Sequence, residues 1–163
     1  MNAEHMPPTL ILGLGNALLG DDGIGCRVAL SLQADGSPPE TEIDVCERGG
    51  LSLMERMLGS RRVILVDALT TGASPRGSVS VWRLESLPNP AAGHMNSAHE
   101  TSLQTALEMA RLLGADVPEE IWVVAVETDR IYEFSEELSP EVAAALPRAL
   151  AAVRALLKEG PAP

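Results

Sequence analysis

The sequence predicts an α/β fold with a mostly parallel sheet. In its first half, short aliphatic runs alternate with segments of helical periodicity, in the order strand, helix, strand, helix, strand. This alternation is typical of parallel strands joined by crossover helices. The polar segment 70–76 then breaks the rhythm, because it is too short for a crossover helix. The strand that follows it is therefore expected to run antiparallel to the strand before it.

Each element has its own local signal. The apolar run 9–14 predicts a strand that is buried on both faces. Apolar residues at helical spacing over 24–32 predict a helix, with Asp21 or Asp22 as its N-cap. Ser139 and Pro140 are typical of the N-cap and first position of a last helix that runs to Lys158. The other expected strands are 41–46, 63–66, 78–84 and 121–126, and the other expected helices are 51–58 and 101–113.

Composition limits the class of protein. The 163 residues predict one domain over 1–163, with ends at about 1–8 and 160–163 that are expected to be disordered. Apolar residues make up 45% and aromatic residues 2%, so the core should be aliphatic. A net charge of −11 argues against nucleic acid and anionic membranes as partners. With no apolar membrane-spanning run and no signal peptide pattern, we expect a cytoplasmic protein.

Three polar residues stand where ligands bind in an α/β sheet. Asp22 follows the first strand and its glycine turn, and Asp67 directly follows the aliphatic run 63–66. The carboxyl ends of parallel strands form the usual ligand edge of such a sheet. His99 is expected in the first turn of a helix capped by Ser97, where the helix dipole would favour the neutral imidazole that binds metals.

Each of the three has a structural alternative: a helix cap for Asp22, a solvated loop acid for Asp67 and a surface histidine for His99. Together, two carboxylates and an imidazole suit a divalent transition metal with open coordination positions. The sequence lacks the His-Glu-x-x-His and Gly-x-Ser-x-Gly protease motifs. Gly13-x-Gly15 lacks the third glycine of a dinucleotide site, so a nucleotide-binding domain is a weaker alternative.

The pattern from Gly13 to Gly25, with Gly15-Asn16 and Asp21-Asp22-Gly23, resembles the hydrogenase maturation endopeptidases. Val66-Asp67-Ala68, Ser97-Ala98-His99 with Leu103, and Leu138-Ser139-Pro140-Glu141-Val142 are similar to three further motifs of that family, in the same order. The resemblance implies a three-layer α/β/α sandwich with a five-stranded mixed sheet and one antiparallel strand. It also implies that Asp22, Asp67 and His99 are the metal-binding and catalytic residues. Some members have Glu where Asp22 stands.

The implied activity is removal of the C-terminal peptide of an immature nickel-iron hydrogenase large subunit after nickel insertion. The nickel would be carried by the precursor, which is the expected partner of a monomeric protease. Family members often have Asp-Gly-x-Thr where this chain has Glu47-Arg48-Gly49-Gly50, so the resemblance does not identify the hydrogenase. A chaperone of the same fold that binds metal or hydrogenase without cleaving it is the alternative.

Overall fold

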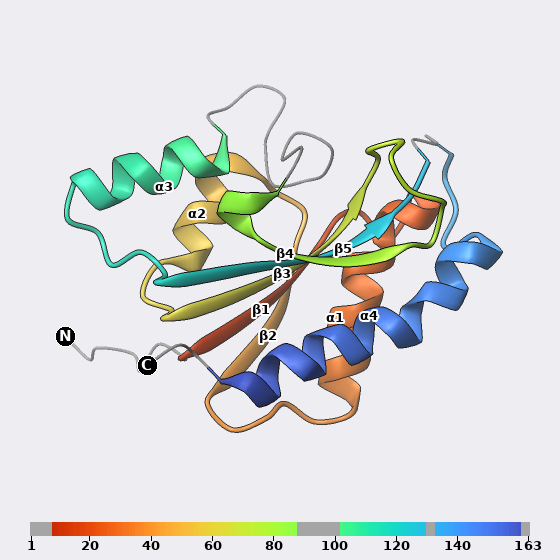
Figure 1. Cartoon of the computed structure of the whole chain (residues 1–163), viewed down its shortest axis with the longest axis horizontal. Coiled ribbons are helices and arrows are strands. Elements are labelled where there is room, and N and C mark those ends of the chain that lie inside the picture. Colours follow the sequence, from red (N-terminus) through yellow and green to blue (C-terminus); the bar gives the residue numbers. More distant parts are fainter. Residues whose placement is uncertain (1–7, 88–101, 130–132, 161–163) are drawn as a thin grey trace.

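The computed structural model describes residues 8–87, 102–129 and 133–160, and within them one five-stranded sheet lies between two layers of helices (Figure 1). The strand order is β2-β1-β3-β5-β4. The strands are β1 (Thr9–Leu14), β2 (Thr41–Cys46), β3 (Arg62–Leu69), β4 (Val79–Arg83) and β5 (Glu120–Glu127). The predicted three-layer α/β/α fold with a mixed sheet is confirmed.

One strand of the sheet runs against the others. β1 pairs in parallel with β2 and β3, and β3 pairs in parallel with β5, whereas β4 pairs antiparallel with β5. The loop between β3 and β4 therefore reverses the chain, as its length predicted. β4 nevertheless does not lie beside β3, because β5 occupies the place between them.

The helices form the outer layers. The sequence-distant helices α1 (Ile24–Ala34) and α4 (Pro140–Glu159) pack against each other and cover one face of the sheet (Figure 1). The helices α2 (Gly50–Met57) and α3 (Leu103–Leu112) cover the other face. Two short 3₁₀ helices, η1 (Gly20–Gly23) and η2 (Leu84–Ser86), complete the described elements.

Alternation along the buried strands builds two aliphatic cores. Leu10 and Leu12 of β1 face α2 and α3, whereas Ile11 faces α1 and α4. In β3 the same alternation places Val63 and Leu65 on the side of α2 and α3. Asp67 comes next after Val63 and Leu65 on that side of β3, so it belongs to the face of the sheet that α2 and α3 cover.

Some expected boundaries were wrong. β3 continues to Leu69 instead of ending at residue 66, so Asp67 lies inside the strand. The N-cap of α1 is Gly23, not Asp21 or Asp22, which belong to η1. α3 begins at Leu103 and its N-cap is Ser102, whose hydroxyl accepts a hydrogen bond from the Thr105 N–H; the expected cap was Ser97.

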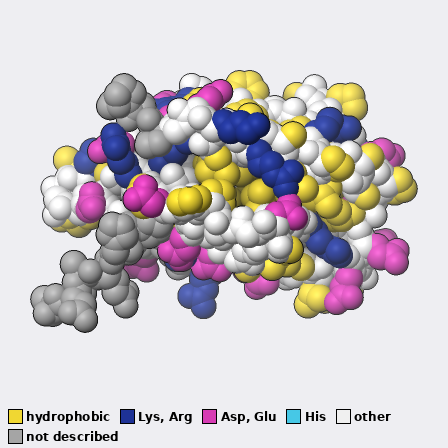
Figure 2. Space-filling model, turned by 90° about the horizontal axis from the view of Figure 1, so that it is seen from below, with side chains coloured by type: hydrophobic (Ala, Val, Ile, Leu, Met, Phe, Trp, Pro, Cys, Tyr) yellow, Lys and Arg dark blue, Asp and Glu magenta, His cyan; other side chains and the backbone are white. Residues whose placement is uncertain are grey.

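The expected disordered ends lie mostly outside the described residues. At their limits, the carbonyl of Pro8 accepts a hydrogen bond of 2.9 Å from the Arg62 N–H, and Gly160 is the C-cap of α4. No helix in the described ranges is long and apolar enough to cross a membrane. Seen from below, positive and negative side chains are interspersed around apolar surface (Figure 2).

Candidate functional site

The loop between β1 and α1 folds back on itself around Asp22. Gly15, with a φ of +112°, turns the chain at the end of β1. The Asn16 N–H then donates a hydrogen bond of 2.8 Å to Oδ2 of Asp22, and the Leu18 N–H donates one of 2.9 Å to Oδ1 of Asn16. These contacts hold the Asp22 carboxylate beside the end of β1, which explains why Gly-Asn and Asp-Asp occur at this spacing.

The adjacent carboxylate, Asp21, has a different role. Its Oδ1 accepts a hydrogen bond of 2.6 Å from the Ser139 N–H, and its Oδ2 accepts one of 2.8 Å from the Ser139 hydroxyl. Because Ser139 is the N-cap of α4, Asp21 compensates the positive end of that helix dipole and joins the loop to α4. Only Asp22 of the two therefore has its carboxylate turned back to the end of β1.

A close contact at Gly25 brings α1 against the ends of the strands. A Cβ atom added at Gly25 would lie 2.3 Å from the Val66 carbonyl oxygen and 2.4 Å from that of Leu14, closer than such atoms approach in proteins. Glycine is therefore needed for helix and strands to meet here. Since Val66 directly precedes Asp67, and η1 packs against β3, the same contact brings the Asp22 loop to the end of β3.

Asp67 is a fully buried carboxylate in the middle of the sheet. Its relative exposure is 0%, and it pairs with Ala125 in the register between β3 and β5. β1 lies on the other side of β3, so Asp67 is one strand away from the turn that carries Asp22. The first and third strands are neighbours in the sheet, and the third strand continues past Asp67 to Leu69.

The thiol of Cys26 shows that these acidic residues converge. Cys26 is buried in the first turns of α1, and its Sγ donates a hydrogen bond of 3.2 Å to the Gly15 carbonyl. Burial, followed by the negative charges of Glu47, Asp22 and Asp67, raises the pKa of the Cys26 thiol to about 11. The carboxylates of Asp22, Asp67 and Glu47, from three segments of the chain, are therefore all near enough to this thiol to act on it, with Asp67 buried and Glu47 exposed.

Glu47 is the residue that the sequence interpretation missed. It follows β2, in the segment that departs from the family pattern, and we had assigned no chemistry to it. Its position after a parallel strand is the same signal that identified Asp67, so the rule of strand ends could have found it.

The third predicted site residue, His99, lies outside the described residues, as does Ser97. The structure brings Asp22 and Asp67 to one edge. Within the described ranges, no group of three His, Cys, Asp or Glu side chains is arranged to hold a metal ion. The metal-binding role of Asp22, Asp67 and His99 therefore stays a prediction.

Comparisons with known proteins agree with the fold and the motifs. A family model described as hydrogenase maturation protease (HycI) matches residues 26–156. The hydrogenase expression/formation protein HupM of Azotobacter chroococcum is 32% identical over 94% of this chain and 73% of its own length. The hydrogenase 2 maturation protease of Escherichia coli is 29% identical over 92% of this chain and 90% of its own length.

Solved structures are similar over nearly the whole chain. The hydrogenase maturating endopeptidase HybD from Escherichia coli superimposes with a TM-score of 0.72 at 28% identity, covering 93% of this chain and 92% of that one. The [NiFe] hydrogenase maturation protease HybD from Thermococcus kodakarensis gives a TM-score of 0.61 at 26% identity, covering 91% and 97%. The likeness therefore includes both the Asp22 loop and the strand that carries Asp67.

Proposed function

We infer the function of this chain from one premise: the chain belongs to the hydrogenase maturation protease family, whose members are peptidases. We propose that it removes the C-terminal peptide of an immature nickel-iron hydrogenase large subunit after nickel has been inserted. One relative is named for hydrogenase 2 and a structural neighbour for [NiFe] hydrogenase, which supports this substrate class. We further propose that it works as a monomer in the cytoplasm.

The observation that carries the proposal is the convergence of Asp22 and Asp67. The two carboxylates come from different elements, yet both act on the Cys26 thiol at the carboxyl edge of the sheet. An edge that gathers carboxylates in this way attracts a cation, and a metal-bearing polypeptide fits that requirement. We propose that Asp22, Asp67 and His99 engage the nickel that the precursor carries.

The described helix α3 supports the inclusion of His99. His99 shortly precedes α3 in the sequence, and α3 covers the face of the sheet to which Asp67 belongs. An imidazole and two carboxylates leave open positions on a divalent metal, so the metal's existing ligands in the precursor need not be displaced. Because the nickel arrives with the substrate, a nickel-free precursor lacks the group that the site recognises.

Hydrolysis then needs a water molecule and a group that takes its proton. In our proposal a site carboxylate accepts that proton while the water oxygen attacks the scissile carbonyl carbon. The carbon–nitrogen bond breaks, and the proton passes to the leaving amine. The substrate's nickel supplies recognition, and as a Lewis acid it would polarise the carbonyl. The loop hydrogen bonds around Asp22 keep its carboxylate oriented before the substrate arrives.

The test is a cleavage assay with the host's large-subunit precursor in nickel-loaded and nickel-free forms, read by intact mass. We expect loss of the C-terminal peptide from the nickel-loaded form alone. Asp67→Asn should abolish cleavage, whereas Glu108→Gln, on the exposed surface of α3, should cleave like wild type. Cleavage of both precursor forms at equal rates would contradict nickel-dependent recognition.

The non-catalytic chaperone predicts a different result. Under that alternative the wild-type protein binds the nickel-loaded precursor without changing its mass, and Asp67→Asn weakens only complex formation. Saturable dinucleotide binding near Gly13 and Gly15 without any cleavage would favour the nucleotide-binding alternative instead.

A further inference from the structure

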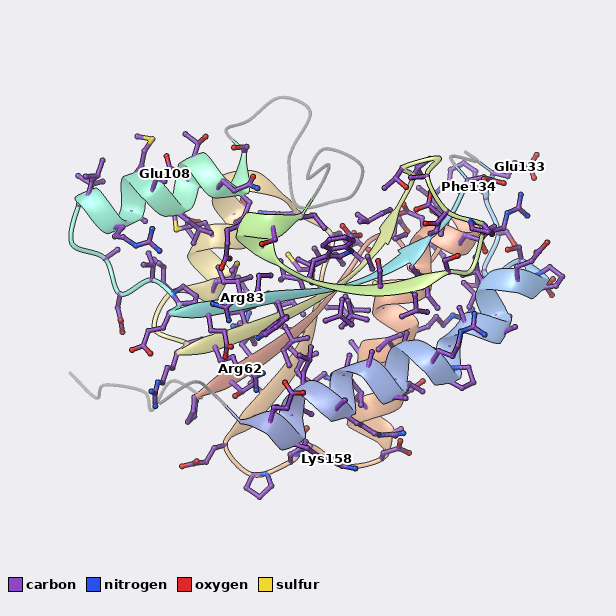
Figure 3. All side chains as sticks on the ribbon, in the orientation of Figure 1. Arg62, Arg83, Glu108, Glu133, Phe134 and Lys158 are labelled. Carbon is purple, nitrogen blue, oxygen red and sulfur yellow. The ribbon has the colours of Figure 1, made fainter. Side chains whose placement is uncertain are left out.

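Two exposed apolar side chains lie beside the candidate site. The chain has one phenylalanine, Phe134, and it is 89% exposed instead of being part of either core. Leu18, in the loop that carries Asp22, is 52% exposed. An exposed phenylalanine ring offers a large apolar surface to a partner, and burying it on binding would be favourable. Figure 3 shows Phe134 next to Glu133, near the beginning of α4 and directed away from the sheet.

Backbone hydrogen bonds place the segments of these two residues next to each other. The Ser135 N–H donates to the Leu18 carbonyl at 2.9 Å, and the Gly20 N–H donates to the Ser135 carbonyl at 2.6 Å. These bonds form a parallel bridge between Leu19 and Ser135. Leu18 and Phe134 directly precede the two bridged residues, so their backbones are neighbours.

The same contacts hold this pair in a set position relative to Asp22. Asp21 anchors one side of the loop to Ser139, and the Arg27 guanidinium donates to the Glu136 carbonyl on the other segment. The apolar pair is thus tied to α1 and α4 at positions that flank the carboxylates.

The surroundings of the pair are acidic. Glu133, Glu136 and Glu137 are exposed and immediately flank Phe134 in the chain. Such a rim attracts positively charged groups and repels acidic ones, which affects the rate of association more than the final affinity. The surface therefore suits a segment that combines an apolar side chain with basic neighbours.

We propose that Leu18 and Phe134 form a docking site for an apolar side chain in the precursor segment next to the scissile bond, and that Glu133 and Glu136 attract basic residues of that segment. This inference rests on the proposed function, because it names the occupant as the same precursor. Two observations support this proposal. Ser135, next to Phe134, is hydrogen-bonded to the loop that carries Leu18 and Asp22, and the surrounding Glu133 and Glu136 are negatively charged. A second copy of this chain would be another occupant, which the experiment below separates.

The test compares Phe134→Ala with Leu112→Ala, because Leu112 is 87% exposed at the end of α3. Both substitutions remove an exposed apolar side chain, so neither should disturb the fold. For Phe134→Ala we expect the KM for nickel-loaded precursor to rise about tenfold with little change in kcat, as at other aromatic anchors. Phe134→Leu should recover most of this loss, and Leu112→Ala should match the wild type. Equal KM values for Phe134→Ala and Leu112→Ala would overturn the docking site.

Charge reversal tests the acidic rim. Glu133→Lys and Glu136→Lys should slow association with the precursor at low salt and reduce its dependence on ionic strength, whereas Glu108→Lys should do neither. A wild-type protein that cleaves normally while all these variants bind alike would reject this inference and leave the proposed function standing. A wild-type protein that neither binds nor cleaves the precursor would reject both. Dimerisation that Phe134→Ala abolishes, without an effect on KM, would assign the surface to a second copy.

Discussion

The two ends of the sheet arrange charged side chains in opposite ways. At the amino-terminal end, Glu120 pairs with two arginines: Arg62 Nε forms an ion pair with its Oε2 at 2.9 Å, and Arg83 Nη1 donates a hydrogen bond to its Oε1 at 2.6 Å. Arg62 also donates to the Leu156 carbonyl at 2.8 Å, and Arg83 lies over the ring of Trp122 at 5.0 Å. At the carboxyl-terminal end, burial raises the pKa of the Cys26 thiol, and the negative charges of Glu47, Asp22 and Asp67 raise it further.

This difference separates the charged residues that hold the fold together from those of the candidate site. Arginine and glutamate neutralise each other at the amino-terminal end, and Arg62 joins β3 to the last turn of α4. This arrangement contributes to stability because removing one member would leave a buried charge. At the other end, several carboxylates act on one thiol, and such an acidic edge suits a cation. Figure 3 shows Arg62 and Arg83 at one end of the molecule and Phe134 and Glu133 at the other.

After the loss of cleavage expected of Asp67→Asn, the largest effect is expected from Asp22→Asn at the carboxyl-terminal end. The amide keeps an oxygen that can accept from the Asn16 N–H, so the loop should remain folded. Loss of the charge should lower kcat/KM for the nickel-loaded precursor by about 10²–10⁴-fold. Cleavage kinetics alongside thermal unfolding would measure both. Wild-type activity in this variant would remove Asp22 from the site.

Arg62→Ala tests the other end. It would leave Glu120 without one of its two arginines, and we expect the free energy of unfolding to fall by about 3–5 kcal/mol. Arg61 and Glu119 are the matched control, because this neighbouring pair is exposed at 47% and 70% and joined at 3.0 Å. Arg61→Ala should cost about 1 kcal/mol or less. Denaturant unfolding gives both values, and any protein that remains folded should cleave normally. Equal losses would contradict the structural role of Arg62.

Gly25→Ala should change both stability and activity, because Gly25 lies where α1 packs against the strands beside the candidate site. The added Cβ would clash with the Val66 and Leu14 carbonyl oxygens, which belong to backbone and cannot rotate away. We expect a loss of about 1–3 kcal/mol in stability together with reduced cleavage. Leu30→Ala, at a half-exposed position on the same helix, should have a smaller effect on both. Unchanged cleavage by Gly25→Ala would show that the helix contact does not position Asp22.

The smallest effect concerns the pH dependence of stability. The pKa of Cys26 rises from 9.0 to about 11 on folding, so the folded state holds the thiol proton more tightly than the unfolded state. The free energy of unfolding should therefore fall as the pH rises from about 9 to about 11. Urea denaturation across this range should show a smaller fall for Cys26→Ala than for wild type. The same slope in both proteins would contradict the raised pKa of this buried thiol.

Local patterns were sufficient for most elements of the fold. β1 and β2 match the predicted ranges, and Ser139 and Pro140 begin α4 as expected, because caps and short apolar runs depend on neighbours in the chain. The predicted boundaries were wrong where pairing with a distant segment lengthened an element. β3 reaches Leu69 because it pairs with β5 along its whole length, and residue 67 alone gives no sign of that partner.

The candidate site, too, was predicted in part from local sequence and decided in part by long-range contacts. Spacing in the chain identified Asp22 and Asp67 and excluded several classes of enzyme, because carboxylates at strand ends and the presence or absence of a motif are properties of local sequence. The choice between Asp21 and Asp22 depended on Ser139, which is 118 residues away in the chain. The convergence of Glu47 with the two aspartates and the place of β5 between β3 and β4 likewise depended on long-range packing. Such contacts form between distant parts of the chain, so they follow from the folded arrangement of strands and helices and not from any short stretch of residues.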